Sequence, residues 1–379
     1  MKIFHLQKIA FSALMLFSAC CLLSSCSNVG NLPTPTQPAP TIVVSTLAGG
    51  GVGNPATITS PIYGRIGSAD GVGTAASFYA PADVVLDAAG NLYVSDSGNH
   101  LIRKVTPLGV VSTFAGNTAG GFENGKGAAA SFSAMQGLAI DPSGNIYVAD
   151  SGNEVIRKIT PDGTVSTFAG TGVAGSSNGT VTTATFKEPT GLAFDVAGNM
   201  YVADFGNKMI RKITTDGTVS TLAGSGATGY NNGTGSTATF TSPDRLVVDG
   251  SGNVFVSDLS LVRKITPDGV VITFAGNVPA SGYSTRADGQ GTAAGIVVAG
   301  GIAMDVNGFI YLGDEEEIRV IRGDGTVTTL AGGGAGNTTD GAANKASFGI
   351  LRGLAVNPAG TTMYVTDYLT SLIRQIALH

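Results

Sequence analysis

A unit of about 54 residues recurs along most of this chain, and that internal period constrains the fold more than any other feature. An aromatic residue marks each copy, at positions 93, 147, 201, 255, 311 and 364. The clearest copies are NLYVSDSGNHLIRKVTPLGVVSTFAG (91–116), NIYVADSGNEVIRKITPDGTVSTFAG (145–170) and NMYVADFGNKMIRKITTDGTVSTLAG (199–224). More divergent copies occupy 253–276, 309–332 and 362–379. A fixed period of this length indicates a fold built from one repeated supersecondary unit.

Each unit contains four short runs with β character, represented in the second copy by GLAID (137–141), NIYVAD (145–150), VIRKIT (155–160) and TVSTFAG (164–170). The links DPSGN and TPDGT are turn sequences, because proline presets φ and glycine accepts positive φ. No segment carries a sustained helical period. Four antiparallel strands per unit, repeated radially, predict an all-β fold, a β-propeller with one blade per unit.

The last unit supplies only three strands, since the chain ends after LIRQIALH. The missing fourth strand matches TIVVSTLAG at 41–49, far upstream of its own unit. An incomplete blade would expose a sheet edge, which is an aggregation hazard. We therefore predict a six-bladed propeller over residues 41–379, closed by pairing this N-terminal strand into the last blade.

The first 40 residues have a different character. Lys2 and Lys8 precede an apolar stretch (9–17) too short to span a bilayer, which predicts a signal peptide over residues 1–25. LSSC (23–26) resembles the bacterial lipobox, and the resemblance implies acylation of Cys26. The alternative is an ordinary signal peptide cleaved nearby. The proline-rich segment 26–40 reads as an extended tether.

The lipobox resemblance also implies a location and a redox state. It places the protein at the bacterial cell envelope, anchored in the membrane by lipid only. The outer membrane is favoured over the inner, because Ser27 is not the Asp that commonly retains such proteins. The other two cysteines, Cys20 and Cys21, would leave with the signal peptide, so disulfides would play no part in stability.

The repeated units resemble those of NHL-repeat propellers, and the first copy contains Asn99, His100 and Leu101 in the string DSGNHLIRK. The resemblance covers 42–379 and implies the propeller fold. It does not specify function, because such propellers serve as protein-binding, RNA-binding and a few catalytic modules.

Two charged positions recur in every unit. A functional interpretation makes them an acidic or ion-binding ring, whereas a structural one makes them a turn-capping Asp and a blade-to-blade ion pair. We favour the structural interpretation, because a ligand seldom needs six identical copies. The positions are Asp96, Asp150, Asp204, Asp258, Asp314 and Asp367, with Arg103, Arg157, Arg211, Arg263, Arg319 and Arg374.

More informative are positions where the copies differ. The long crossovers between units share one face with the turns that follow the second strand, and long loops on a rigid scaffold often carry function. We expect the start of each first strand to surround the channel mouth on that face, forming a polar binding site for a small ligand or a partner residue. The alternative is a set of polar residues that plug the channel. The candidate residues are Asp83, Gln136, Thr190, Asp244, Arg245 and Arg352.

Enzymatic interpretations have less support. His100 and His379 are the only histidines after the leader, too few for a histidine metal cluster or a Ser-His-Asp arrangement. Gluconolactonase-like propellers, which resemble this chain, hold a divalent metal at the channel mouth. Here only Asp83 and Asp244 could serve, so Ca²⁺ remains an option without a full ligand set, and we expect no cofactor.

The formal net charge is −5, and about −7 (−5 minus 2) without the two leader lysines, which argues against a nucleic-acid partner. We expect a monomeric, non-catalytic binding or scaffold module whose ligand is a protein or another envelope component. The alternative is a metal-dependent gluconolactonase-like hydrolase or lyase. Polysaccharide binding is a third option, with Tyr63, Tyr79, Tyr230 and Tyr283 as stacking candidates.

Overall fold

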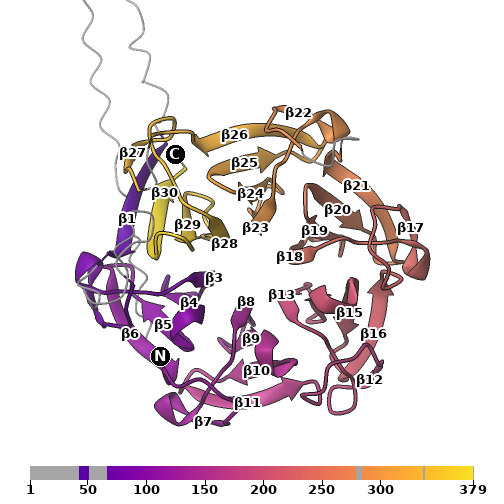
Figure 1. The fold of residues 1–379 in the computed structure, drawn as a ribbon, viewed down its shortest axis with the longest axis horizontal. Coiled ribbons are helices and arrows are strands. Elements are labelled where there is room, and N and C mark those ends of the chain that lie inside the picture. The colour runs from indigo at the N-terminus through magenta and orange to yellow at the C-terminus, as the bar shows by residue number, and fades with distance from the viewer. Residues whose placement is uncertain (1–41, 51–65, 279–283, 336–337, 379) are drawn as a thin grey trace, which may run out of the picture. The chain divides into compact units, whose positions relative to one another are not determined.

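The computed structural model describes residues 42–50, 66–278, 284–335 and 338–378 of the 379-residue chain. These residues form six antiparallel sheets arranged radially around a central channel (Figure 1). The predicted all-β, six-bladed propeller is confirmed. Each sheet has five strands, one more than predicted, because a two-residue strand in the preceding crossover pairs with the outermost strand of the blade.

The first three blades follow one pattern. From the channel outward, blade one contains β3 (Pro81–Leu86), β4 (Leu92–Asp96), β5 (Leu101–Val105), β6 (Val110–Gly116) and β2 (Gly71–Val72). Blade two contains β8 (Met135–Ile140), β9 (Ile146–Asp150), β10 (Val155–Ile159), β11 (Thr164–Ala169) and β7 (Gly125–Lys126). Blade three contains β13 (Pro189–Phe194), β14 (Met200–Asp204), β15 (Met209–Ile213), β16 (Thr218–Ala223) and β12 (Gly179–Thr180).

The next three blades repeat it. Blade four contains β18 (Pro243–Val248), β19 (Val254–Asp258), β20 (Leu261–Ile265), β21 (Val270–Gly276) and β17 (Gly233–Thr234). Blade five contains β23 (Ala299–Met304), β24 (Ile310–Asp314), β25 (Glu317–Ile321), β26 (Thr326–Gly332) and β22 (Gly289–Gln290). Blade six contains β28 (Leu351–Val356), β29 (Thr362–Asp367), β30 (Leu372–Ala377), β1 (Val43–Gly49) and β27 (Gly341–Ala342).

Single 3₁₀ turns occur in two places. One group follows the short outer strand in the crossovers: η1 (Gly73–Ala75), η3 (Gly127–Ala129), η6 (Gly235–Thr237) and η7 (Gly291–Ala293). The other group joins the second and third strands of the first three blades: η2 (Ser97–Asn99), η4 (Ser151–Asn153) and η5 (Phe205–Asn207). We call the face bearing the crossovers and these second-to-third turns the crossover face, and the opposite one the tight-turn face.

The ring closes as predicted. β1 pairs antiparallel with β30, with Val43 opposite Ala377 and Gly49 opposite Leu372. On its other side, β1 pairs with β27, so both of its edges are occupied. The first described strand therefore completes the last blade and leaves its third strand without a free edge.

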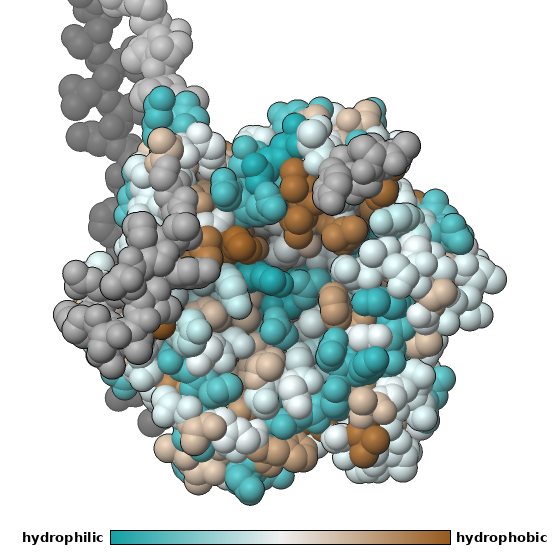
Figure 2. Space-filling model, in the orientation of Figure 1, coloured by the Kyte–Doolittle hydropathy of each residue, from teal (hydrophilic) through white to brown (hydrophobic). Residues whose placement is uncertain are grey.

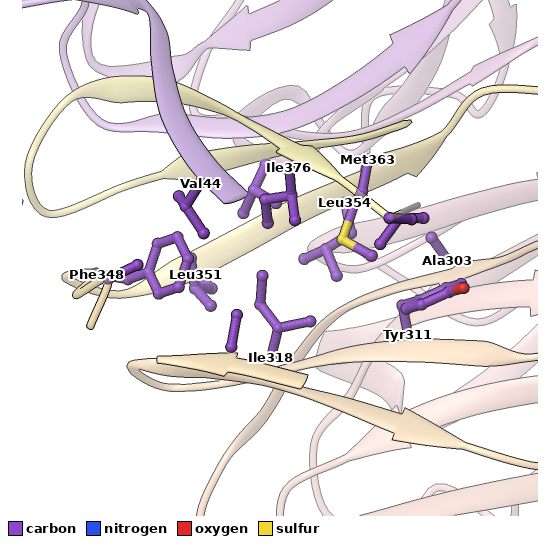
Figure 3. Close-up of a cluster of buried hydrophobic side chains, with 13 residues drawn as sticks. Val44, Ala303, Tyr311, Ile318, Phe348, Leu351, Leu354, Met363 and Ile376 are labelled. Carbon is purple, nitrogen blue, oxygen red and sulfur yellow. The ribbon is translucent and has the colours of Figure 1, made fainter. Parts of the chain in front are cut away.

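The core lies between neighbouring blades rather than at a single centre. In the cluster between blades five and six, Val44 of β1 packs with Phe348, Leu351, Met363 and Ile376 (Figure 3). Val44 and Ala48 are fully buried, which adds apolar burial to the hydrogen bonds of the closing strand. Ring closure is thus stabilised by packing as well as by strand pairing.

Candidate functional site

The first strand of every blade borders the channel, and its third residue is glycine in four blades: Gly137, Gly191, Gly301 and Gly353. A side chain at these positions would collide with the neighbouring strand. A Cβ on Gly137 would lie 2.2 Å from the carbonyl oxygen of Thr190, for example. The two exceptions in this series are Asp83 and Arg245.

Asp83 and Arg245 come from blades one and four, which face each other across the ring (Figure 1). Their side chains meet inside the channel, with 3.8 Å between Arg245 Nε and Asp83 Oδ2. Arg245 Nη2 also donates to the carbonyl of Ala82 at 3.2 Å and to Gln136 Oε1 at 3.4 Å. Arg245 is only 4% exposed and bridges the channel as a buried cation.

Asp83 sits in a nest of backbone donors. Its Oδ1 accepts the N–H of Val84, and its Oδ2 accepts the N–H of Leu138 in blade two, both at 2.9 Å. Burial raises the pKa of Asp83 to about 6, although Arg245 and the two N–H groups oppose that rise. The carboxyl group is therefore ionised at neutral pH and becomes protonated in mildly acidic solution.

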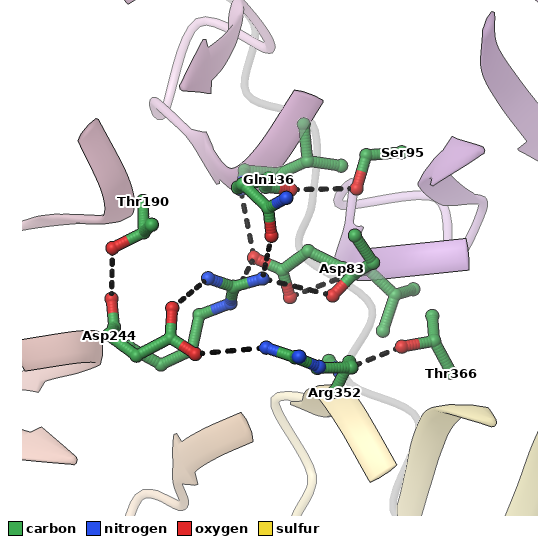
Figure 4. A network of polar contacts seen from close by, with 12 residues as sticks. Asp83, Ser95, Gln136, Thr190, Asp244, Arg352 and Thr366 are labelled. Atoms are coloured by element: carbon green, nitrogen blue, oxygen red, sulfur yellow. Dashed lines mark hydrogen bonds and ion pairs between the residues drawn. The ribbon is translucent and has the colours of Figure 1, made fainter. Parts of the chain in front are cut away.

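Closer to the crossover face, Asp244 connects the two arginines. Its Oδ1 lies 2.6 Å from Arg245 Nη1, and its Oδ2 lies 3.3 Å from Arg352 Nη1. Thr190 donates its hydroxyl to the carbonyl of Asp244 at 2.9 Å. The structure thus brings all six predicted mouth residues into one network drawn from five blades (Figure 4).

The network separates two hollows. The first, of about 440 Å³, opens on the crossover face and contains four of the predicted residues, whereas Asp83 and Arg245 lie deeper and border the channel beneath. Figure 2 shows the crossover face, with hydrophilic residues around the channel opening and hydrophobic side chains gathered on one side of it. We call the first hollow the mouth pocket; its lining includes Gln136, Thr190, Asp244, Arg352, Glu154, Glu188, Phe205 and Tyr368.

Four of those lining residues are not among the predicted ones. Phe205 and Tyr368 are half-buried aromatics that directly follow the repeated Asp, where the first two copies have serine. That departure from the repeat was visible in the sequence. Glu154 and Glu188 are brought together by folding, because the Glu154 carboxylate accepts the backbone N–H of Glu188 from the next blade.

The six repeated Asp and Arg residues lie away from the mouth pocket, inside the blades. In blade two, Arg157 Nη1 lies 2.8 Å from Asp150 Oδ2, and both side chains are fully buried. Arg157 also donates to the Ser131 carbonyl and to Asn124 Oδ1 in the preceding crossover. Asp150 accepts the N–H of Ser133 from that crossover.

The same pairing recurs in every blade, with N–O distances of 2.8 to 3.7 Å. The predicted blade-to-blade ion pair is wrong, because the two residues occupy adjacent strands of one sheet. They tie the incoming crossover to its blade instead. Burial raises the pKa of Asp96 to about 6, and its ion pair with Arg103 limits that rise.

Other predicted positions are dispersed or lie elsewhere. Tyr79 and Tyr230 are 41% and 39% exposed on different crossovers. Tyr63, Tyr283, Cys26 and segments 1–25 and 26–40 fall outside the described residues. Within the described parts of the chain, no helix has the length and apolar character that crossing a membrane requires.

The carboxylate oxygens at the channel mouth are poorly suited to coordinate calcium. Arg245 engages both carboxylates, Asp83 and Asp244, so the oxygens that would hold a cation already face a guanidinium. Among the described residues, no three histidine, cysteine or carboxylate side chains converge as a metal site needs.

Fold and repeat together define the class: the chain is a six-bladed β-propeller whose units are similar to NHL repeats. The family model for the NHL repeat matches residues 78–105. The NHL repeat-containing protein 2 of Homo sapiens is 28% identical over 329 residues, which cover 76% of this chain and 45% of that protein. SUPPRESSOR OF QUENCHING 1 of Arabidopsis thaliana is 40% identical over 96 residues, 25% of this chain and 9% of that protein. The chain thus spans less than half the length of these relatives.

Solved structures share the fold. An auxiliary nutrient binding protein from Bacteroides thetaiotaomicron superposes with a TM-score of 0.67 at 14% identity, covering 89% of this chain and 76% of that one. A protein of unknown function from the same species gives a TM-score of 0.65 at 19% identity with the same coverage. A streptogramin B lyase gives 0.51 at 10% identity, covering 89% and 98%. At these identities, the likeness extends to the fold alone.

Proposed function

We propose that this propeller is a non-catalytic binding module that holds a protein or another envelope component at the mouth pocket. The observation that carries the proposal is where the repeats depart from their common pattern. Phe205, Asp244, Arg352 and Tyr368 all differ from their counterparts in most other blades, and all line one hollow. A site built from exceptions to a repeat is better explained by a ligand than by the needs of the scaffold.

Arg352 is the group best placed to meet that ligand. Its side chain is 39% exposed, and within the described parts of the chain it makes one ion pair, with Asp244 at 3.3 Å. The guanidinium carbon lies 5.4 Å from the ring centre of Tyr368, which holds the charged group over an aromatic face. Arginine and tyrosine are over-represented among the residues that dominate binding energy at interfaces. The ligand group at this point is therefore a hydrogen-bond acceptor.

A capture experiment tests the proposal. Residues 41–379 would be immobilised and exposed to a detergent extract of the cell envelope, beside the Arg352→Ala/Tyr368→Ala variant. Arg322→Ala is the matched control, since Arg322 is exposed on a tight turn of the opposite face. A component captured by wild type and control but not by the double variant supports the proposal. Capture that is insensitive to the double variant would overturn it.

An activity assay on the purified protein tests the enzymatic alternative. Lactone hydrolysis by the wild type in the presence of Ca²⁺, lost on addition of a chelator and in Asp244→Ala, would replace the binding proposal with a hydrolase. We expect no such turnover, because Asp244 is occupied by two arginines.

We further propose that Cys26 carries a lipid that anchors the protein at a bacterial envelope, with the outer membrane as the site. The lipobox resemblance of LSSC supports this proposal. Incorporation of labelled palmitate into the wild type and not into Cys26→Ser is the expected result. Equal labelling of the two proteins, or none in either, would exclude the anchor.

A further inference from the structure

The channel beneath the Asp83–Arg245 bridge forms a second hollow, on the face opposite the mouth pocket. It has a volume of about 480 Å³ and is bordered by the first strands of all six blades. The bridge closes its inner end, and the first-to-second turns form its outer rim. Its wall includes the half-buried apolar side chains of Leu86, Ile140, Phe194, Met304 and Val356, and Asp87 adds one half-buried carboxylate near the rim.

The rim of this hollow combines carboxylates with exposed apolar side chains. The first-to-second turns carry Asp87, Asp141, Asp195, Asp249 and Asp305. Val196 and Val306 are 87% and 74% exposed, far more than valine usually is in a folded protein. A neighbouring hollow of about 720 Å³ shares Leu86, Ile140 and Phe194 with the channel and widens its opening. The residue after the turn Asp or Asn is uncharged in every blade: Ala88, Pro142, Val196, Gly250, Val306 and Pro358.

The inner end offers a hydrogen-bond donor. Arg245 Nε is buried and makes no hydrogen bond to any residue that the structure describes; Asp83 Oδ2 lies 3.8 Å from it. The repeated arginines also have an unbonded Nε, but those lie inside the blades, whereas Arg245 borders the channel. An unmet buried donor costs free energy that an acceptor on a ligand would recover.

The net charge of the network favours a neutral hydrogen-bond acceptor on the ligand over an anionic one. Asp83 and Asp244 offset Arg245 and Arg352, so the four side chains sum to zero when all are ionised. A ligand anion would add an uncompensated charge in an apolar channel, beside the carboxylate of Asp83. A neutral carbonyl accepts the same hydrogen bond without that penalty.

We propose that the tight-turn end of the channel binds a neutral acyl compound, with an unbranched aliphatic chain along the apolar wall and an ester or amide carbonyl at Arg245 Nε. This site is separate from the mouth pocket and does not depend on the function proposed for it. The occupant is a free small molecule, since the channel is enclosed by six strands and is entered from one end.

Titration of the full chain with methyl octanoate, followed by calorimetry, tests the proposal. We expect saturable binding at one site with a dissociation constant of about 1 mM or tighter, which is typical for a ligand of this size. Sodium octanoate at pH 7.5 should bind at least about tenfold more weakly, because its charge is uncompensated. No binding of the ester, or equal binding of ester and carboxylate, would overturn the proposal.

Variants locate the binding. Met304→Glu places a charge in the channel wall and should abolish binding, whereas Leu108→Glu, on an 85% exposed turn, should leave it unchanged. Arg245→Met removes the donor and should weaken binding by about tenfold, the loss of one hydrogen bond to a charged group. If Arg245→Met does not fold, Met304→Glu still decides, and ester binding that survives Met304→Glu refutes the site.

A second arm separates free acyl compounds from membrane lipids. Phosphatidylcholine vesicles present the same acyl esters within a bilayer, and we expect no binding to them. Association with vesicles in the absence of binding to methyl octanoate would show that the exposed valines of the rim contact a lipid surface, and would overturn the proposal.

Discussion

The bridge between Asp83 and Arg245 should stabilise the ring through a coupling that a double-mutant cycle can measure. At 3.8 Å and an effective dielectric constant of about 20, two unit charges attract by about 4 kcal/mol. The net coupling is smaller, because Asp244 competes for the guanidinium and burial disfavours the charge on Asp83. We expect about 2 kcal/mol of coupling between Asp83→Ala and Arg245→Ala at pH 7.5.

The single variants should differ in cost. Arg245→Ala leaves Asp83 buried without its cation and should lower the free energy of unfolding by about 3 kcal/mol. Asp83→Ala should cost only about 1 kcal/mol, because Arg245 keeps Asp244, and only the N–H groups of Val84 and Leu138 lose their acceptor. Denaturant unfolding of the four proteins gives these values directly.

A surface pair provides the matched control for this cycle. Lys126 Nζ and Asp162 Oδ2 lie 3.0 Å apart, with side chains 67% and 57% exposed, so solvent screening should leave their coupling far smaller than that of the buried bridge. At pH 5, Asp83 is largely protonated and its coupling to Arg245 should fall toward the same value. A coupling at pH 7.5 no larger than that of the surface pair would refute the structural role of the bridge.

The remaining predictions concern ring closure, the repeated ion pair and pH. Deleting residues 42–48 should expose the edge of β30, and should cause aggregation or lower the free energy of unfolding by more than about 4 kcal/mol. Light scattering and denaturant unfolding measure these effects. The control deletion of residues 30–36 should cause neither. Arg157→Leu should lower the free energy of unfolding by about 3–5 kcal/mol, because it leaves Asp150 unpaired. The control Lys158→Leu, on the same strand, should lower it by less than about 1 kcal/mol. Equal losses in the two variants would contradict the stabilising role of the ion pair. Because the pKa of Asp83 is raised to about 6 in the folded state, proton uptake by Asp83 adds to stability; this addition is complete below about pH 4 and is lost as pH rises through about 6. Unfolding from pH 4 to 7 should therefore show the wild type losing up to about 3 kcal/mol relative to Asp83→Asn, and a constant difference would disprove the raised pKa.

The repeated pattern in the sequence is sufficient to predict the local structure and the closure of the ring. Each unit repeats the same alternation of apolar and polar residues and the same turn sequences. Because the strands within a blade are close in sequence, one unit of the repeat is enough to predict one blade. The closing strand was equally readable, because β1 matches the fourth strand of every other unit. The short outer strands were missed, since two-residue pairings such as Gly125–Lys126 with β11 leave no alternating pattern.

The sequence does not show which of the non-repeated residues contact each other, or how deep in the channel each one lies. Those features follow from the tertiary structure. The sequence placed six residues at one mouth, but Arg245 lies 163 positions from Ala82 and reaches it only because blades one and four oppose each other. The radius of the ring and the directions of the side chains separate these residues. Asp83 and Arg245 border the inner channel, whereas Asp244 and Arg352 line the mouth pocket. Such contacts depend on the geometry of the whole ring, which no single repeat encodes.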